Sequence, residues 1–232
     1  MTISIEEFNP GPSDHNVLCV DVCGTLYNQN TTADFVKFHH DIVGNRLRKF
    51  FLNLISGERN PLVYAMVLIG KVIKKDIHRD LSIFSLKGEA RSSLQNSSRL
   101  YVLHLKKYEI RPIHSFVERM RKEGWKPILV SNSLDIVIEA IAEQMSVDMV
   151  ASKLSWSNHW CTGHIATDLT GEKRRHVELL LGLSLSAINC AVVTDNRSDS
   201  DLIAVSTAAW LVAKKSCRKW MAAYPEADIV II

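Results

Sequence analysis

Short apolar runs alternate with segments of helical periodicity along most of the chain. The apolar runs predict strands at Val17–Val20, Pro127–Val130, Val147–Ala151, Cys190–Thr194, Ala209–Val212 and Ile229–Ile232. The periodic segments predict helices at Ile113–Glu123, Leu134–Met145, Lys173–Leu181 and Asp199–Val205, and His159–Thr167 predicts a hairpin that turns near Gly163. Short strands that alternate with helices indicate a parallel sheet covered on both faces. We therefore expect an α/β fold with a doubly wound, Rossmann-like sheet.

One long stretch interrupts this alternation. Apolar residues recur at helical spacing from Phe35 to Ile55 and again over Leu62–Ile73, and a further helix is expected around Glu89–Leu105. No convincing strand pattern lies between these segments. We expect residues 33–111 to form a small helical cap, inserted into a core domain made of residues 1–32 and 112–232, with 1–15 as an irregular lead-in.

Composition narrows the class of protein. The 232 residues are 47% apolar and 23% charged, as in ordinary soluble domains, and the net charge of +3 gives no reason to expect a nucleic-acid partner. No apolar run reaches the roughly 18 residues of a spanning helix, and the N-terminus lacks the pattern of a signal peptide. The five cysteines are scattered without a Cys-x-x-Cys pair, which favours free thiols and a reducing cytoplasm. His39, His40, His78 and His104 show no ligand spacing with a matching carboxylate, so no zinc enzyme is expected.

Three polar residues follow directly after predicted strands. They are Asp21, Ser131 and Asp195. The carboxyl ends of parallel strands meet at one edge of the sheet, and ligands bind in the crevice there. We therefore expect a functional site at this edge.

Four segments resemble the motifs of one family. Asp21-Val22-Cys23-Gly24-Thr25 is similar to the Asp-x-Asp-Gly-Thr motif of the haloacid dehalogenase (HAD) superfamily, and Ile128–Ser131 resembles its second motif. Gly171-Glu172-Lys173 resembles the third motif, and the pair Asp195 and Asp199 resembles the fourth. The connecting segments and the insertion after the first motif look like the phosphoserine-phosphatase-like branch.

The resemblance implies a Mg²⁺-dependent phosphohydrolase. Asp21 would be the nucleophile that forms an aspartyl-phosphate. The side chains of Asp21 and Asp195 and the backbone carbonyl of Cys23 would bind Mg²⁺, with Asp199 as a further ligand or an outer-shell partner. Ser131 and Asn132 would hold phosphoryl oxygens, and Lys173 would offset charge on Asp21 and the phosphate. Asp201 is expected on an exposed helix surface.

Cys23 departs from the family pattern, because it replaces the second aspartate of the first motif. In the family's phosphatases that aspartate is the general acid and base, a role worth about 10²–10⁴-fold in rate. Three hypotheses follow: a phosphohydrolase of reduced activity or with a substrate that has a good leaving group, a different hydrolase chemistry on Asp21, or a phosphate-binding protein without turnover.

The expected cap is basic. Residues 34–111 contain 15 Lys or Arg and 7 Asp or Glu. This excess suits a small anionic, phosphorylated substrate, although a solvated helical surface has the same composition. Lys71, Lys74, Lys75 and Arg79 follow an apolar stretch at near-helical spacing, a pattern also found on surfaces that touch anionic lipid, which leaves a membrane-proximal or lipid-linked substrate open.

Overall fold

A seven-stranded sheet forms the centre of the molecule. The computed structural model describes residues 16–55, 64, 68, 70 and 76–232. The strands are β1 (Asn16–Val20), β2 (Lys126–Leu134), β3 (Asp148–Ser157), β4 (Trp160–Thr167), β5 (Asn189–Thr194), β6 (Ala208–Ala213) and β7 (Asp228–Ile231). They lie in the order β4-β3-β2-β1-β5-β6-β7, and every neighbouring pair is parallel except β3 and β4.

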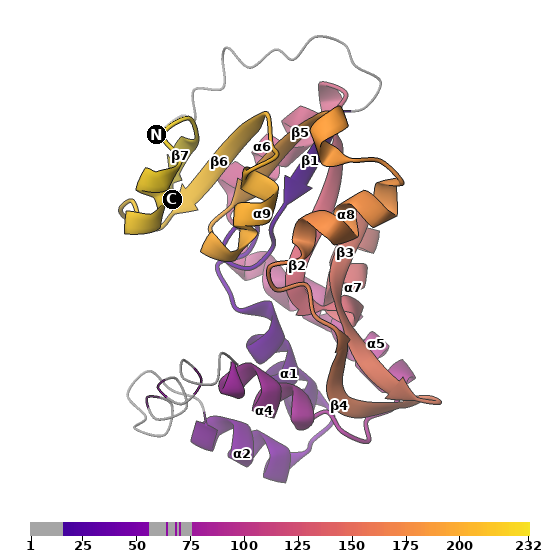
Figure 1. The fold of residues 1–232 in the computed structure, drawn as a ribbon. Coiled ribbons are helices and arrows are strands. Elements are labelled where there is room, and N and C mark those ends of the chain that lie inside the picture. Colours follow the sequence, from indigo (N-terminus) through magenta and orange to yellow (C-terminus); the bar gives the residue numbers. More distant parts are fainter. Residues whose placement is uncertain (1–15, 56–63, 65–67, 69, 71–75) are drawn as a thin grey trace.

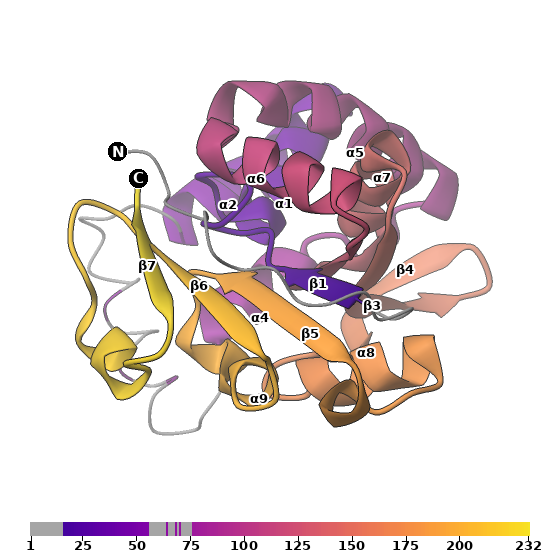
Figure 2. The same cartoon turned by 90° about the horizontal axis from the view of Figure 1, so that it is seen from above.

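Helices cover both faces of the sheet (Figure 2). The helices are α1 (Thr31–Ile42), α2 (Arg46–Ile55), α4 (Ile77–Phe84), α5 (Arg91–Leu105), α6 (Arg111–Lys122), α7 (Asp135–Met145), α8 (Lys173–Leu181) and α9 (Ser200–Ile203). Short 3₁₀ turns are η1 (Lys106–Tyr108), η2 (Leu185–Ala187), η3 (Arg197–Asp199) and η4 (Lys219–Ala223). Helices α6 and α7 lie on one face of the sheet, and α8 and α9 lie on the other (Figure 2).

The alternation of side chains along β1 explains why both faces are covered. Successive residues of a strand point to opposite faces. Leu18 and Val20 join the apolar cluster under α6 and α7, whereas Val17 and Cys19 join the cluster under α8 and α9. A strand that is apolar on both faces needs two helical layers, so the doubly wound α/β prediction is confirmed.

The chain between β1 and β2 contains α1, α2, α4, α5 and α6, and we call α1, α2, α4 and α5 the helical insertion. Helices α1, α2 and α4 lie beyond the carboxyl end of β1, away from the two helical layers (Figure 1). Among the described residues α5 packs against both α1 and α7. The lead-in 1–15, most of the expected helix Leu62–Ile73, and Lys71, Lys74 and Lys75 lie outside the described residues. In the described part of the chain, no helix is long and apolar enough to cross a membrane.

Several predicted boundaries were wrong. The hairpin consists of β3 and β4, and it turns at Asn158 and His159, where Asn158 has a φ of 54°. Gly163 lies inside β4, at a position that favours glycine because a Cβ there would come within 3.0 Å of the Phe84 carbonyl oxygen. The predicted strand over 127–130 continues to Leu134, with a shift in register after Ser131.

Candidate active site

Two neighbouring parallel strands bring Asp21 and Asp195 to the same edge of the sheet. Val20 of β1 pairs with Val193 of β5, and the backbone N–H of Asp21 donates to the Val193 carbonyl at 2.9 Å. Each aspartate is the first residue beyond its strand, and both side chains are buried. The two carboxylates therefore lie at neighbouring strand ends, where the sequence predicted them.

Lys173 lies at the centre of the site. It is the first residue of α8, and its Nζ donates to Asp21 Oδ1 and to Asp199 Oδ2, each at 2.8 Å. The Lys173 side chain is only 1% exposed. Burial by itself would lower the pKa of Lys173, but the two carboxylates outweigh it and raise this pKa above its ordinary value. Lys173 therefore remains a cation at physiological pH.

Asp199 is held by donors on both of its oxygens. Thr194 Oγ1 donates to Oδ2 at 2.7 Å, and Ser198 Oγ donates to Oδ1 at 3.2 Å. With Lys173 also on Oδ2, the Asp199 carboxylate is fully engaged by protein groups. Its geometry suits a residue that orients Lys173.

Negative charge is concentrated around Asp21. Burial and the nearby carboxylates of Asp199 and Asp195 together raise the pKa of Asp21 to about 7, against the opposing charge of Lys173. Burial also raises the pKa of Asp195, although the Arg218 guanidinium 3.1 Å from its Oδ2 opposes this shift. Crowded carboxylates of this kind are stabilised by a divalent cation, and carboxylate oxygens are the ligands that Mg²⁺ prefers.

The turn after β1 is shaped to fit these carboxylates. Gly24 has a φ of +79°, and a Cβ on it would lie 2.5 Å from Asp195 Oδ2, closer than atoms can approach. The next residue, Thr25, donates from Oγ1 to Asp21 Oδ2 at 3.1 Å and accepts from the Asp195 N–H at 3.0 Å. The Gly-Thr pair thus lets the Asp195 carboxylate approach the backbone and joins it to Asp21.

Cys23 points into a network of hydroxyl groups. Its Sγ lies 2.8 Å from Thr31 Oγ1, which lies 2.6 Å from Ser133 Oγ. Burial raises the pKa of the Cys23 thiol, and the charge of Asp21 raises it further. The group at the position of the second aspartate is therefore a protonated thiol at physiological pH.

A pocket of about 670 Å³ opens beside this network. It is lined by Cys23, Gly24, Asn28, Gln29, Asn30, Thr32, Ala33, Asp76, His78, Arg79, Asn132, Ser133, Thr170, Asn196, Ser198 and Lys214. These residues come both from the sheet edge and from the helical insertion. Arg79 of α4 joins the two parts, since it donates to the Asn132 carbonyl at 2.8 Å and forms an ion pair with Asp168.

The two predicted phosphate-binding residues differ in their surroundings. Ser131 is buried, and its Oγ accepts from the N–H of Ser133 at 3.2 Å. Asn132 lines the pocket, and its Oδ1 is buried without a hydrogen-bond partner among the described residues. An unpaired buried oxygen next to a pocket is typical of a group whose partner is a ligand or water.

Asp201 is a correction to the sequence-based prediction. It is half-buried, and its Oδ2 accepts from the Arg174 N–H at 2.8 Å, so it caps the first turn of α8. Sequence reasoning also missed Arg218 and Ser133. Arg218 reaches the site only through the fold, whereas Ser133 lies two residues after Ser131 in β2, where the second motif could have revealed it.

No family model matches this chain, and a comparison with curated proteins finds no match. Solved structures do share its fold. A protein of unknown function from Bordetella pertussis Tohama I aligns with a TM-score of 0.72 at 15% identity, over 93% of this chain and 98% of that one. A HAD family hydrolase from Salmonella enterica serovar Typhi aligns with a TM-score of 0.60 at 13% identity, over 95% and 68%.

A phosphoserine phosphatase in its apo form aligns with a TM-score of 0.57 at 13% identity, over 93% of both chains. At such identities the similarity concerns the path of the chain. The protein thus has the fold found in HAD-family hydrolases and phosphoserine phosphatases.

Proposed function

We propose that this protein is a Mg²⁺-dependent phosphohydrolase that acts on a small anionic phosphorylated compound through Asp21. The observation that carries the proposal is the buried Lys173 ammonium, which lies 2.8 Å from both Asp21 and Asp199 at the carboxyl edge of the sheet. Burying three charged groups together costs free energy even when they are well paired, so fold stability alone does not explain a lysine at this position. The arrangement suits phosphoryl transfer, which needs a fixed nucleophile and positive charge near the phosphoryl oxygens.

Asp21 is oriented for the role of nucleophile. Lys173 holds Oδ1 and Thr25 holds Oδ2, so the carboxylate cannot rotate freely. One Asp21 oxygen would attack phosphorus, and the bond from phosphorus to the leaving oxygen would break. Water would then cleave the aspartyl-phosphate, releasing inorganic phosphate and restoring the carboxylate.

The donor set around Asp21 fits Mg²⁺. The side chains of Asp21 and Asp195 and the backbone carbonyl of Cys23 would bind it, while Asp199 would act from the outer shell because Lys173, Thr194 and Ser198 already engage its oxygens. The close approach of the Asp195 carboxylate to the Gly24 backbone, next to the Cys23 carbonyl, supports this assignment. A bound Mg²⁺ would supply charge neutralisation for the phosphoryl oxygens.

The pocket supports the proposed substrate class. Lys214 and Arg79 both line it, so an anionic compound would meet positive charge there. We assign the helical insertion the role of a cap over this pocket. Compared with a carboxyl group, the protonated Cys23 thiol is a poor proton donor, because its pKa is raised. This favours a substrate whose leaving group needs little protonation, such as an acyl phosphate or an anhydride.

A comparison of two substrates tests the proposal. Phosphate release from acetyl phosphate and from a simple alkyl phosphate is measured with Mg²⁺ for the wild type and for Asp21→Asn. We expect turnover of the acyl phosphate alone, abolished by Asp21→Asn. Asn196 lines the same pocket, and Asn196→Asp serves as a control. It changes the number of carboxylates at the site while leaving the proposed nucleophile Asp21 in place.

The hydrogen-bonded thiol also favours a second candidate, a phosphate-binding protein without turnover. Tight, Mg²⁺-dependent binding of inorganic phosphate by calorimetry, with no hydrolysis of either substrate, would replace the enzyme proposal with this one.

A further inference from the structure

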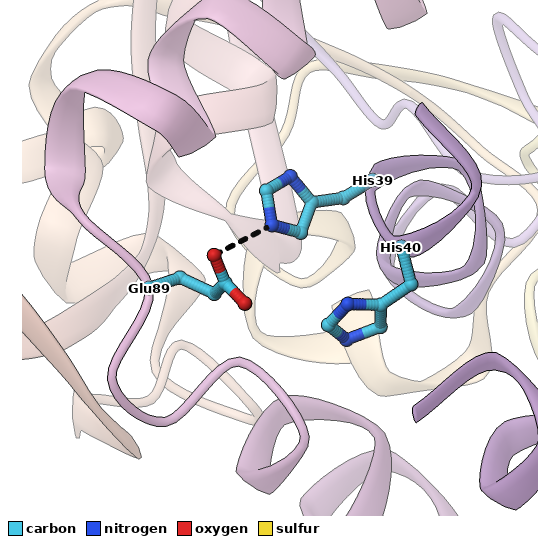
Figure 3. Close-up of side chains that lie close together, drawn as sticks. All are labelled: His39, His40 and Glu89. Carbon is cyan, nitrogen blue, oxygen red and sulfur yellow. Dashed lines mark ion pairs between the residues drawn. The ribbon is translucent and has the colours of Figure 1, made fainter. Parts of the chain in front are cut away.

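A second cluster of metal-binding residue types lies in the helical insertion, away from Asp21. His39 and His40 are adjacent on α1, and Glu89 faces them from the turn between α4 and α5 (Figure 3). One ligand atom from each residue lies within 4.8 Å of the other two. His39 lies eight positions along α1 from Thr31, whose hydroxyl contacts Cys23, so the cluster is about 12 Å along the helix from the candidate active site.

Hydrogen bonds determine which ring nitrogen of each histidine carries a proton. Ser97 Oγ lies 2.8 Å from His39 Nδ1, but its single hydrogen is donated to the Ser93 carbonyl, so Ser97 must accept from His39 Nδ1–H. The remaining nitrogen of His39, Nε2, then carries a lone pair in the neutral ring. That nitrogen lies 3.3 Å from Glu89 Oε2.

His40 repeats the arrangement with the opposite nitrogen. Ser85 Oγ lies 3.1 Å from His40 Nε2, and Ser85 donates its hydrogen to the Ser82 carbonyl. Ser85 therefore accepts from His40 Nε2–H, which leaves a lone pair on Nδ1. Both His39 Nε2 and His40 Nδ1 are buried without a hydrogen-bond partner in the described part of the chain.

Two buried imidazole lone pairs and the half-buried Glu89 carboxylate thus face one another, an arrangement that suits a metal cation. Arg48 does not fill the role between the donors, since it binds the other Glu89 oxygen, Oε1, and the Lys87 carbonyl. Its contact leaves Oε2 directed at His39.

The geometry and the surrounding contacts agree with a zinc site. With bonds of about 2.0–2.1 Å, neighbouring ligands of tetrahedral Zn²⁺ lie about 3.3 Å apart. His39 Nε2 and Glu89 Oε2 already have this spacing of 3.3 Å, and all three donors lie within 4.8 Å of one another. Histidine ligands of metals characteristically donate their other N–H to a fixed acceptor, here Ser97 and Ser85. Glu89 is itself held by a backbone hydrogen bond from Cys161 N–H to its carbonyl at 2.9 Å.

We propose that His39 Nε2, His40 Nδ1 and the Glu89 carboxylate bind one Zn²⁺ ion, which fastens α1 to the turn before α5. The ion would leave one coordination position for water. The sequence pattern predicts no zinc enzyme, because the matching carboxylate lies far along the chain and reaches the histidines only in the folded insertion. The proposal stands independently of phosphohydrolase activity.

Zinc content and affinity test it. The protein is stripped with a chelator, reloaded with Zn²⁺ and passed through a desalting column, and metal is measured by mass spectrometry in the wild type and in Asp195→Asn, which disables the candidate active-site metal position. We expect one Zn²⁺ per chain to remain in Asp195→Asn. Co²⁺ in place of Zn²⁺ should give the intense visible absorption of a four-coordinate site.

Two serines of α5 provide a matched pair of variants. Ser97→Ala removes the acceptor that orients His39 and should weaken Zn²⁺ binding about 10–100-fold. Ser98→Ala removes an equally buried hydroxyl that donates only to the Gln95 carbonyl, and it should leave the affinity unchanged. His40→Gln should abolish retention while circular dichroism remains that of the wild type.

Any of three results would overturn the assignment. The first is no Zn²⁺ retained by Asp195→Asn. The second is equal affinity of the Ser97→Ala and Ser98→Ala variants. The third is an NMR spectrum of the metal-treated protein at neutral pH in which His39 is doubly protonated, since a proton would then be the cation between the donors.

Discussion

Replacing Cys23 by aspartate should restore the missing general acid and base. Cys23 lies on the pocket wall, and its Sγ is already within 2.8 Å of Thr31 Oγ1, with Ser133 Oγ a further 2.6 Å along the chain of hydroxyls. These groups can donate to a carboxylate without rearrangement of the backbone. A general acid and base contributes about 10²–10⁴-fold, equivalent to about 3–5 kcal/mol of barrier.

The assay is steady-state hydrolysis of p-nitrophenyl phosphate and of an alkyl phosphate in the presence of Mg²⁺. Cys23→Asn is the matched control, because asparagine has the shape of aspartate but cannot exchange a proton at neutral pH. We expect kcat for the alkyl phosphate to be about 100-fold or more higher in Cys23→Asp than in Cys23→Asn, with a smaller gain for the aryl phosphate, whose leaving group needs less protonation.

Equal rates for the aspartate and asparagine variants, with both folded and both binding Mg²⁺, would refute this reasoning. A gain that survives the addition of Asp21→Asn to Cys23→Asp would refute it in another way. The new carboxylate would then act without the proposed nucleophile.

Three further predictions concern groups around the site and in the core. Lys173→Met leaves the two carboxylates that it bridges without their cation, so urea denaturation should show a loss of about 3–5 kcal/mol and phosphate release should cease. Gly24→Ala should lower kcat/KM by about 100-fold, because the new Cβ would displace Asp195. Gly88 has a similar positive φ but open space around it, so Gly88→Ala should leave kcat/KM unchanged; equal effects of the two variants would contradict the steric argument. Burial lowers the pKa of His114 below 6.5, so the unfolded state takes up a proton first as the pH falls. The urea midpoint should therefore drop between pH 7 and 5, and His114→Gln should reduce that drop; an unchanged pH slope in the variant would contradict it.

The fold could be predicted because its signals are local. Residues 17–20 of β1 are all apolar, which indicates a strand buried on both faces, and Gly24 and Thr25 mark the turn that follows it. The same reasoning extends to the strand before Asp195. Since parallel strands end at one edge, the proximity of the two aspartates follows from the fold class.

Other features depend on contacts between distant parts of the chain. Arg218 meets Asp195, and Glu89 meets His39, only after folding, and no spacing in the sequence connects either pair. The turn of the hairpin was misplaced because Gly163 was interpreted as a turn residue. Position 163 instead needs glycine because the end of α4 approaches it closely, which a sequence pattern does not reveal.

The central claim is that Asp21 accepts a phosphoryl group, and a crystal structure with Mg²⁺ and fluoroberyllate tests it most directly. Beryllium trifluoride imitates a phosphoryl group attached to a carboxylate. We predict an adduct on one Asp21 oxygen, with Lys173 beside it and Mg²⁺ bound by Asp21, Asp195 and the Cys23 carbonyl. A structure that contains Mg²⁺ at this edge of the sheet, but has no adduct on Asp21 at saturating fluoroberyllate, would contradict the account.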